Sequence, residues 1–243
     1  MKIKIASYNI QHCRDHMYFK ENGTERLVLP EMANVIKAMK ADVCALNEVY
    51  NQEMLEGGIN QAKEIGKELG FYHAFAKAID YKGYEYGNAL VSRFPIVSTK
   101  LVPLVLPEEK KKKPRYENRV LLIAELDVNG SPLTVFVCHF GLSPEEAELA
   151  TENVLAEAEK ISTPLVFMGD LNLTPDSELI KKISARLFDT AQLSDAENFT
   201  FSSDAPFEKI DYIFTNGLCK ATSFEVPNLV CADHLPVRAD IEI

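Results

Sequence analysis

The most informative stretch of the sequence is an apolar run that leads into an aspartate and an asparagine. Residues 165–168 (LVFM) are consecutive apolar residues, the pattern of a strand buried on both faces. Gly169 follows, and Asp170 and Asn172 then stand two positions apart. Side chains at that spacing in a strand lie on one face, so we expect both to point into one cleft. Burying a carboxylate with an amide is costly unless something binds them. The alternative is a turn that only ends the strand.

Polar side chains also follow other apolar, strand-like segments of the chain. Together with Asp170 and Asn172, these residues are Asn9, Glu48, His139, Asp211, Asp233 and His234. Sites in α/β proteins form where strand ends converge, so we expect one cleft to hold them all. Carboxylate and amide oxygens without a thiolate suit a hard cation such as Mg²⁺ or Mn²⁺. One histidine in such a place is more commonly structural than catalytic, so the recurrence of the pattern is what favours a site.

The elements that must position these side chains follow from the hydrophobic pattern. Apolar runs predict strands at residues 2–10, 43–46, 71–79, 86–97, 120–128, 133–138, 165–168, 209–214 and 235–243. Helical spacing and helix start and stop signals predict helices at residues 30–39, 58–70, 143–160 and 177–182. Ser143, Pro144 and Glu146 form a helix-start signal, and Asn129-Gly130 is a two-residue hairpin turn. Residues 11–25 are polar and irregular, and we expect a loop there.

These strands and helices alternate only loosely, and hairpins occur among the crossovers. That order favours an α/β fold in which two mixed sheets pack together with helices outside. No linker rich in Gly, Ser or Pro divides the 243 residues, so we expect residues 1–243 to form a single domain.

Composition narrows the class of protein. The cysteines number five, an odd count without a C-x-x-C pair, which disfavours a disulfide framework or a zinc–thiolate site. The first residues alternate too early for a signal peptide, and no apolar run approaches the ~18 residues of a transmembrane helix. We therefore expect a soluble, cytoplasmic monomer. The net charge of −10 disfavours tight binding of polymeric nucleic acid, although it leaves such a partner open.

A series of motifs, in this order along the chain, resembles those of the endonuclease/exonuclease/phosphatase superfamily. They are residues 7–10 (SYNI), 46–49 (LNEV), 86–96 (YGNALVSRFPI), 138–140 (CHF), 169–172 (GDLN), 210–213 (IDYI) and 233–237 (DHLPV). That superfamily includes DNase I-like nucleases, abasic-site endonucleases, inositol polyphosphate 5-phosphatases and sphingomyelinases. The sequence departs from the usual pattern at Asn47, where Gln is common, and at Ala232, where Ser usually precedes the Asp-His pair.

The resemblance implies a four-layered α/β/β/α sandwich that cleaves phosphodiesters or phosphomonoesters with a divalent metal, Mg²⁺ or Mn²⁺. It implies that Glu48 is the principal metal ligand, helped by Asn9 and Asp233. By the same resemblance, Asp170 orients or deprotonates the attacking water, and Asn172 holds the phosphate or that water. Such a division of work suits phosphoryl transfer, which needs charge neutralisation and in-line positioning more than covalent catalysis.

The remaining roles that the resemblance implies concern histidines and an arginine. His234 hydrogen-bonds a phosphate oxygen or aids proton transfer, and Asp211 fixes its orientation. His139 corresponds to the second histidine of the DNase-like branch, and Arg119 to its phosphate-binding arginine. Glu85 is a candidate partner for His139, as Asp211 is for His234.

The substrate is less well defined by the sequence. We expect a metal-dependent phosphoesterase that acts on a small or exposed phosphate ester. The alternatives are a DNA or RNA endo- or exonuclease and a non-catalytic binding module of the same fold. The tyrosines Tyr81, Tyr84 and Tyr86 either stack a base or sugar or pack on the sheet. The run Lys110–Lys113 either attracts a polyphosphate headgroup or is a solvated loop.

Overall fold

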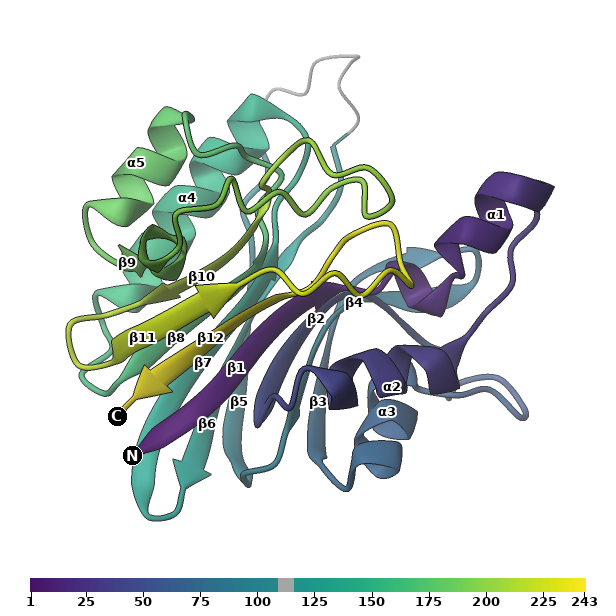
Figure 1. The fold of residues 1–243 in the computed structure, drawn as a ribbon, viewed down its shortest axis with the longest axis horizontal. Coiled ribbons are helices and arrows are strands. Elements are labelled where there is room, and N and C mark those ends of the chain that lie inside the picture. Colours follow the sequence, from purple (N-terminus) through teal and green to yellow (C-terminus); the bar gives the residue numbers. More distant parts are fainter. Residues whose placement is uncertain (109–115) are drawn as a thin grey trace.

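In the computed structural model, which describes residues 1–108 and 116–243, two six-stranded β-sheets pack face to face (Figure 1). The first sheet contains, from edge to edge, β11 (Lys220–Glu225), β12 (Val237–Glu242), β1 (Lys2–Asn9), β2 (Val43–Asn51), β4 (Tyr84–Ser92) and β3 (Tyr72–Tyr81). The second contains β5 (Ile96–Pro103), β6 (Val120–Val128), β7 (Ser131–His139), β8 (Leu165–Asp170), β10 (Asp211–Thr215) and β9 (Phe188–Asp189). The lysine run Lys110–Lys113 lies outside the described residues.

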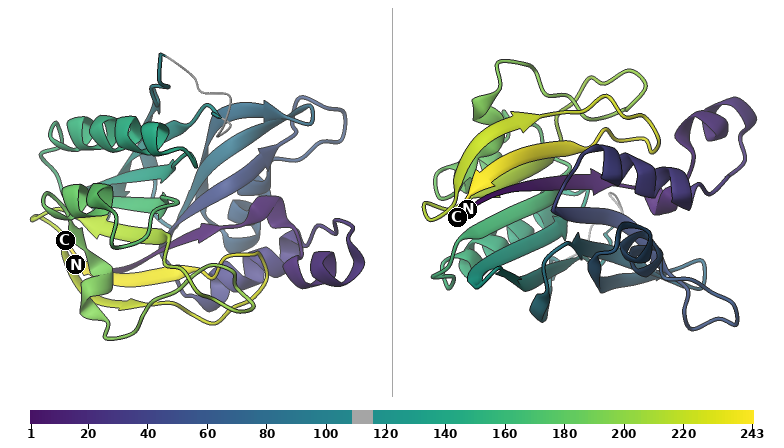
Figure 2. Two further views of the ribbon diagram at one scale, coloured as in Figure 1. Left: turned by 90° about the horizontal axis from the view of Figure 1, so that it is seen from above. Right: turned by 60° about the horizontal axis from the view of Figure 1, so that its bottom comes forward.

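Helices cover the outer face of each sheet (Figures 1 and 2). They are α2 (Leu29–Ala38) and α3 (Gln61–Leu69) on the first sheet and α4 (Pro144–Ala158) and α5 (Glu178–Ser184) on the second. Helix α1 (His16–Asn22) projects beyond the sheets, and η1 (Gln11–Cys13) and η2 (Thr190–Leu193) are short 3-10 helices. One apolar cluster fills the space between the sheets, a second lies under α2 and α3, and a third lies under α4 and α5. The predicted four-layered α/β/β/α sandwich with two mixed sheets is therefore confirmed.

The surroundings of strand β8 explain why residues 165–168 are all apolar. Val166 and Met168 face the cluster between the sheets, whereas Leu165 and Phe167 face the cluster under α4 and α5. Each of these side chains is at most 1% exposed. A strand with helices on one face and a second sheet on the other has no solvent-exposed face, so both rows of its side chains are apolar.

Local signals in the sequence act as predicted in two places. Ser143 caps α4 by accepting a hydrogen bond from the backbone N–H of Glu146 at 3.1 Å. Asn129 and Gly130 connect β6 to β7 with φ angles of 54° and 89°, which is the turn that matches the twist of a two-residue hairpin.

Three expectations about the elements were wrong. Residues 11–25 contain η1 and α1, because Asp15 caps α1 by accepting from Tyr18 N at 2.9 Å. The span 86–97 is divided between β4 and β5, which belong to different sheets. The strand predicted at 43–46 continues to Asn51 as β2. Patterning identifies apolar runs, but it does not show where a chain passes from one sheet to the other.

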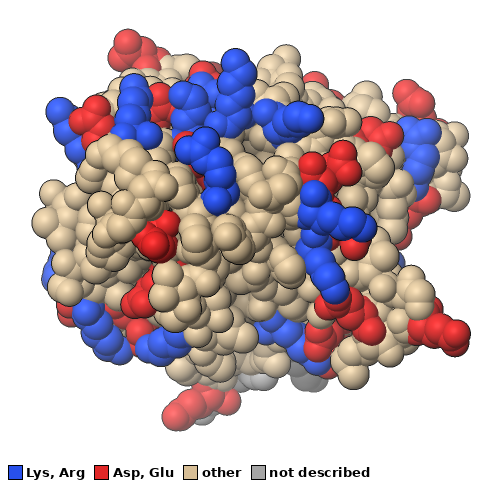
Figure 3. Space-filling view, turned by 90° about the horizontal axis from the view of Figure 1, so that it is seen from below, with Lys and Arg blue, Asp and Glu red and all other residues tan. Residues whose placement is uncertain are grey.

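None of the helices in the described ranges is long and apolar enough to span a membrane. On the face drawn in Figure 3, basic and acidic side chains lie interspersed, so this face offers no continuous basic surface.

Candidate active site

Three neighbouring strands of the second sheet bring His139, Asp170 and Asp211 side by side. In the parallel pair β7 and β8, His139 is the Cα partner of Asp170. In the antiparallel pair β8 and β10, Asp170 is the Cα partner of Asp211. The register of the sheet therefore places Asp170 between the other two residues, at one edge of the sandwich.

Gly169 is required for this close approach of β7 and β8. Its φ angle is +150°, and a Cβ atom at this position would lie 1.8 Å from the carbonyl oxygen of Cys138. Any other residue would push the strands apart directly beside Asp170. The glycine that precedes the aspartate is thus part of the positioning of the site.

Asn172 reaches the site by a different route from the one predicted. β8 ends at Asp170, and Asn172 lies beyond it with φ of 50°. The Asp170 Oδ1 atom accepts a hydrogen bond from Asn172 N at 2.9 Å, and Asn172 Nδ2 donates to the carbonyl oxygen of Phe140 at 3.0 Å. The backbone is therefore the turn that was the alternative reading, yet the side chains of Asp170 and Asn172 line the same cavity.

Glu48 enters the site from the first sheet through a bulge in β2. Between Leu46 and Val49 the strand has one residue more than its partner β4, and Glu48 has φ of 59°. The extra residue interrupts the alternation of faces, so the consecutive residues Asn47 and Glu48 both contact groups of the site. Tyr86 holds Glu48 by donating its hydroxyl to Oε2 at 2.5 Å.

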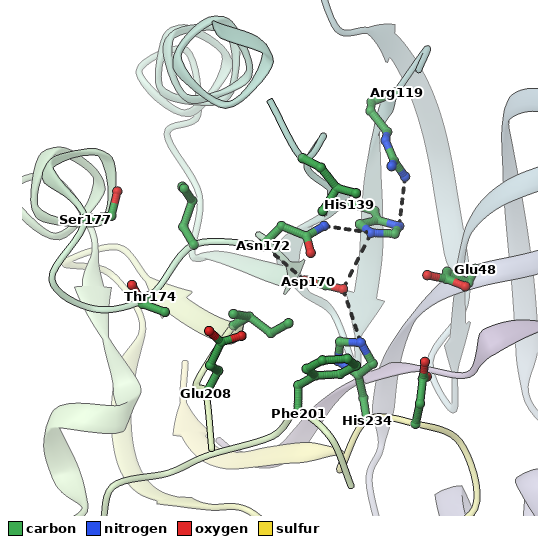
Figure 4. A pocket seen from close by; sticks show the side chains of 14 residues that line it. Glu48, Arg119, His139, Asp170, Asn172, Thr174, Ser177, Phe201, Glu208 and His234 are labelled. Atoms are coloured by element: carbon green, nitrogen blue, oxygen red, sulfur yellow. Dashed lines mark hydrogen bonds and ion pairs between the residues drawn. The ribbon is translucent and has the colours of Figure 1, made fainter. Parts of the chain in front are cut away.

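The main cavity of the site has a volume of about 530 Å³. The predicted residues that line it are Glu48, Arg119, His139, Asp170, Asn172, Asp233 and His234. Figure 4 shows Asp170 between the two histidines, with Glu48 on one side and Thr174 and Ser177 on the other. Asn9 and Asp211 lie directly behind this lining, in contact with Asp170 and His234 respectively. The structure thus brings every predicted site residue to one place.

Asn9 joins the two carboxylates that come from opposite sheets. Its Nδ2 atom donates to Glu48 Oε1 and to Asp170 Oδ2, both at 3.1 Å. Its Oδ1 atom accepts from the backbone N–H of Gln11 at 3.1 Å. Ligation of a metal by Asn9 would require Oδ1 to take the place of Nδ2, because only the oxygen has a lone pair to give.

The electrostatics of Asp170 and His234 are set by burial and by each other. Asp170 is 1% exposed, and this burial raises its pKa, although His234 at 3.6 Å from Oδ2 opposes the rise. Burial alone would lower the pKa of His234, but Asp211 at 2.8 Å and Asp170 outweigh it and raise the pKa. His234 is therefore an imidazolium at neutral pH, whereas Asp170 has a higher proton affinity than an ordinary aspartate.

His139 has the opposite character. Burial and the Arg119 guanidinium lower the pKa of His139 well below its usual value, so the ring is neutral. Arg119 Nη1 lies 3.0 Å from Nδ1, which must be the acceptor because a guanidinium only donates. The expectation that Glu85 partners His139 was wrong: Glu85 accepts from Asn51 at 2.7 Å instead.

Two groups of residues could hold a cation. Asp170, Asp211 and His234 offer ligand atoms that all lie within 4.8 Å of one another. However, His234 Nδ1 is bonded to Asp211, so ligation would have to use Nε2 and would displace the proton that the raised pKa of His234 retains. On the other side, Glu48 and Asp233 supply carboxylate oxygens. The buried Oδ1 atoms of Asp211, in the first group, and of Asp233, in the second, both lack a hydrogen-bond partner among the described residues. An unpaired, buried carboxylate oxygen fits a hard cation such as Mg²⁺ or Mn²⁺.

A buried pair of amides ties the two sheets together beneath the site. Asn47 Oδ1 accepts from the backbone N–H of Asp170 at 3.0 Å, and Asn47 Nδ2 donates to Cys138 O at 3.0 Å. Asn47 Nδ2 also donates to Asn88 Oδ1 at 2.8 Å, and Asn88 Nδ2 donates to Val120 O at 2.9 Å. Asn47 and Asn88 belong to the first sheet, and their backbone partners belong to the second. This bridge fixes the position of Asp170 relative to the first sheet.

We expect Asn47→Leu to lower the free energy of unfolding by about 3–5 kcal/mol, because it leaves an N–H and two oxygens buried without partners. Urea denaturation followed by circular dichroism measures the loss. Asn22→Leu, at an exposed position of α1, is the matched control and should change stability by less than about 0.5 kcal/mol. Equal stabilities of the two variants would show that the bridge is not a structural link.

Sequence patterning did not predict the contacts that four residues make in support of this site, although Tyr86 was named as a possible stacking residue. Gln11 donates its amide to Asp233 Oδ2, Tyr86 holds Glu48, and the ring of Phe201 packs 5.0 Å from that of His234. Asn47 was noted only as a departure from a common glutamine. The position of Asn47 directly before Glu48 was the one sequence signal that it lies at the site. The other contacts were missed because hydrogen bonds between distant segments leave no periodic pattern in the sequence.

Comparison with known proteins gives a consistent result for the fold. The model of the endonuclease/exonuclease/phosphatase family matches residues 6–234. A search of curated proteins gave no match. Among solved structures, an endonuclease/exonuclease/phosphatase from Beutenbergia cavernae is 23% identical with a TM-score of 0.79, over 100% of this chain and 72% of that one.

Two further solved structures resemble the chain over nearly its full length. A mannosyl-6-phosphatase from Bacteroides thetaiotaomicron is 17% identical with a TM-score of 0.76, over 99% of this chain and 100% of that one. The catalytic domain of human nocturnin, with a bound sulfate anion, is 17% identical with a TM-score of 0.69, over 99% and 94%. At these identities the similarity concerns the fold.

Proposed function

Because the chain belongs to the endonuclease/exonuclease/phosphatase family, we propose that it is a phosphoesterase that hydrolyses small or exposed phosphate esters with a divalent metal ion. The observation that carries this proposal is the convergence in one cavity of a buried carboxylate, a protonated histidine, a neutral histidine and an arginine. A volume of about 530 Å³ suits a small ester substrate.

Glu48 and Asp233 would hold the metal ion, with Asn9 as a further ligand if its amide presents Oδ1. When bound, Mg²⁺ or Mn²⁺ would neutralise phosphate charge and lower the pKa of water. Asp233 fits this role because burial raises its pKa and the neighbouring Glu48 carboxylate adds to that rise. Two carboxylates in such proximity favour a cation between them.

Asp170 accepts the proton of the attacking water in this proposal. Its pKa is raised by burial, so its carboxylate is a stronger base than an exposed aspartate, and the neighbouring His234 imidazolium favours the ionised form. Asn172 is fixed against Asp170 and Phe140 O, and its position in the cavity lets it orient the water or a phosphate oxygen.

His139, Arg119 and His234 stabilise the charge of the phosphate. The Arg119 guanidinium lies against His139, and both line the cavity on the same side of Asp170. His234 lies on the other side, held by Asp211, and donates from Nε2. Donors fixed in advance on both sides of a transferring phosphoryl group supply the electrostatic stabilisation that this reaction needs.

The direct test is hydrolysis of p-nitrophenyl phosphate and bis-p-nitrophenyl phosphate with Mg²⁺ or Mn²⁺, with and without EDTA. Metal-dependent release of p-nitrophenol supports the proposal, and the better of the two esters distinguishes a monoesterase from a diesterase. A nuclease would instead cleave oligonucleotides, with activity that falls steeply as salt rises. If none of these is cleaved with either metal, the result contradicts the proposal and favours a binding module of the same fold.

We expect Arg119→Ala to raise KM for p-nitrophenyl phosphate by roughly 10–100-fold, because a hydrogen bond between charged groups is lost in the bound state. A smaller change in kcat is expected, since the guanidinium contacts phosphate before and during the reaction. Steady-state kinetics at saturating metal measures both constants. Arg93→Ala, whose side chain is 58% exposed, is the matched control. An unchanged KM for Arg119→Ala would remove Arg119 from the phosphate site.

A further inference from the structure

A second cavity, of about 330 Å³, adjoins the first on the side of Glu48. Glu48, Arg119 and His139 line both cavities, so a phosphate held between them would have space on two sides. The remaining polar lining of the second cavity comes from η1 and the residue after it, the loop between α1 and α2, the β3–β4 hairpin and the segment before β6. It includes His12, Arg14, Glu25, Tyr81, Tyr86 and Glu117.

His12 is a buried polar group that no residue of the described chain satisfies. Its side chain stacks on Tyr50 at 4.5 Å between ring centroids, and His12 is 6% exposed. Neither ring nitrogen has a hydrogen-bond partner among the described residues, and Glu25 Oε1 is 3.8 Å from Nε2. Such a group costs stability. Because both nitrogen atoms are buried, a ligand in the cavity would satisfy them only if the ring turned toward it. The backbone of η1 has positive φ at this residue, 46°, and His12 forms part of the lining of the cavity.

The chemistry of His12 suits a hydroxyl group. Burial lowers the pKa of His12, so the ring is neutral at pH 7. A neutral imidazole offers one donor and one acceptor, which is the pair that a hydroxyl group can use.

The rest of the lining combines aromatic rings with balanced charges. Tyr81 and Tyr86 pack together at 5.5 Å between centroids, and both also line the cavity. Both also pack on Tyr50 of β2, at 6.4 Å and 5.2 Å between centroids. The tyrosines therefore pack on the sheet, as one interpretation of the sequence expected, and still present a surface to a ligand. Glu25 and Glu117 lie opposite the guanidinium groups of Arg14 and Arg119, at 4.0 Å and 3.2 Å. Carboxylates paired in this way still have lone pairs that accept hydroxyl hydrogens.

We propose that the second cavity is a subsite for a hydroxylated ring, a sugar or a cyclitol, that is esterified to the scissile phosphate. The proposal rests on the function proposed above, because that function places the phosphate between the two cavities. The C–H face of the ring packs on Tyr81 and Tyr86, and its hydroxyl groups bond to His12 and the carboxylates.

The test compares glucose 6-phosphate and myo-inositol 1-phosphate with n-propyl phosphate, which lacks a ring and hydroxyl groups, by release of inorganic phosphate. The wild type should prefer at least one ring ester by about tenfold or more in kcat/KM. His12→Phe keeps the stacking on Tyr50 but removes both nitrogens, and Tyr81→Ala removes part of the aromatic wall. Each should lower that preference about tenfold.

Tyr72→Ala is the matched control, because Tyr72 is at the opposite end of β3 and is 52% exposed. It should leave the preference unchanged. Thermal unfolding should show that His12→Phe is at least as stable as the wild type, since the buried nitrogens are gone. The subsite proposal is wrong if the wild type does not prefer a ring ester over n-propyl phosphate. It is also wrong if His12→Phe and Tyr81→Ala keep that preference.

A failure of the proposed function can be distinguished from a failure of the subsite proposal. If p-nitrophenyl phosphate is not hydrolysed under any metal condition, titration calorimetry with myo-inositol 1-phosphate and glucose 6-phosphate tests the subsite by binding alone. Binding that His12→Phe weakens about tenfold supports the subsite without catalysis. Absence of binding for both ring phosphates overturns it. The two ring phosphates also distinguish a cyclitol from a sugar.

Discussion

Asp170→Asn is expected to lower kcat for p-nitrophenyl phosphate by about 10³-fold while KM stays within a few-fold of the wild type. The amide keeps the size of the side chain and can still accept the hydrogen bond from Asn172 N. It cannot take a proton from water. A loss confined to kcat is the signature of a group that acts in the transition state rather than in binding the substrate.

The measurement is steady-state kinetics at saturating Mg²⁺ or Mn²⁺, with circular dichroism to show that the variant is folded. Asp195→Asn, at an exposed position, is the matched control and should behave as the wild type. A folded Asp170→Asn variant with wild-type kcat would remove Asp170 as the base. Another group that lines the cavity would then have to accept the proton of the attacking water.

Much of the fold followed from local patterns in the sequence. The apolar run before Asp170 is buried on both faces, and Ser143 and Asn129-Gly130 act as the cap and turn that their types predict. These features depend on neighbours in the sequence, so patterning can detect them. The collection of polar strand ends into one cavity was also predictable, because strand ends on one edge of a sheet lie together.

The details that organise the site depend on contacts between distant segments, and these left no local signal. The bulge that turns Glu48 inward follows from the pairing of β2 with β4. The partner of His139 is Arg119, which comes from the start of the neighbouring strand β6, rather than Glu85. Asn172 reaches the cavity from a turn with positive φ instead of from the strand. Each difference arises from tertiary geometry, which overrides the side-chain alternation of an isolated strand.

Glu48→Gln is expected to raise the Mg²⁺ or Mn²⁺ concentration for half-maximal activity by more than about 100-fold, since changes even one shell away from a metal typically cost 10–100-fold in affinity. The fold should survive the change. Tyr86 and Asn9 both donate to Glu48, and a glutamine keeps the shape and one acceptor oxygen for them. EDTA should abolish the activity of the wild type.

Metal binding must also be measured without turnover, because a catalytic defect alone would lower activity. Titration calorimetry with Mn²⁺ should show the same loss of affinity in Glu48→Gln, whereas Glu178→Gln, with a side chain 86% exposed, should bind as the wild type does.

The alternative cation position is the Asp170, Asp211 and His234 cluster. If Glu48→Gln binds Mn²⁺ normally and Asp211→Asn does not, the metal belongs to that cluster. Because Asp211 keeps His234 protonated while no metal is bound, a metal there would have to displace that proton, and its affinity would rise with pH. A metal on Glu48 and Asp233 displaces no proton from an imidazolium, so the two sites differ in the number of protons released on binding.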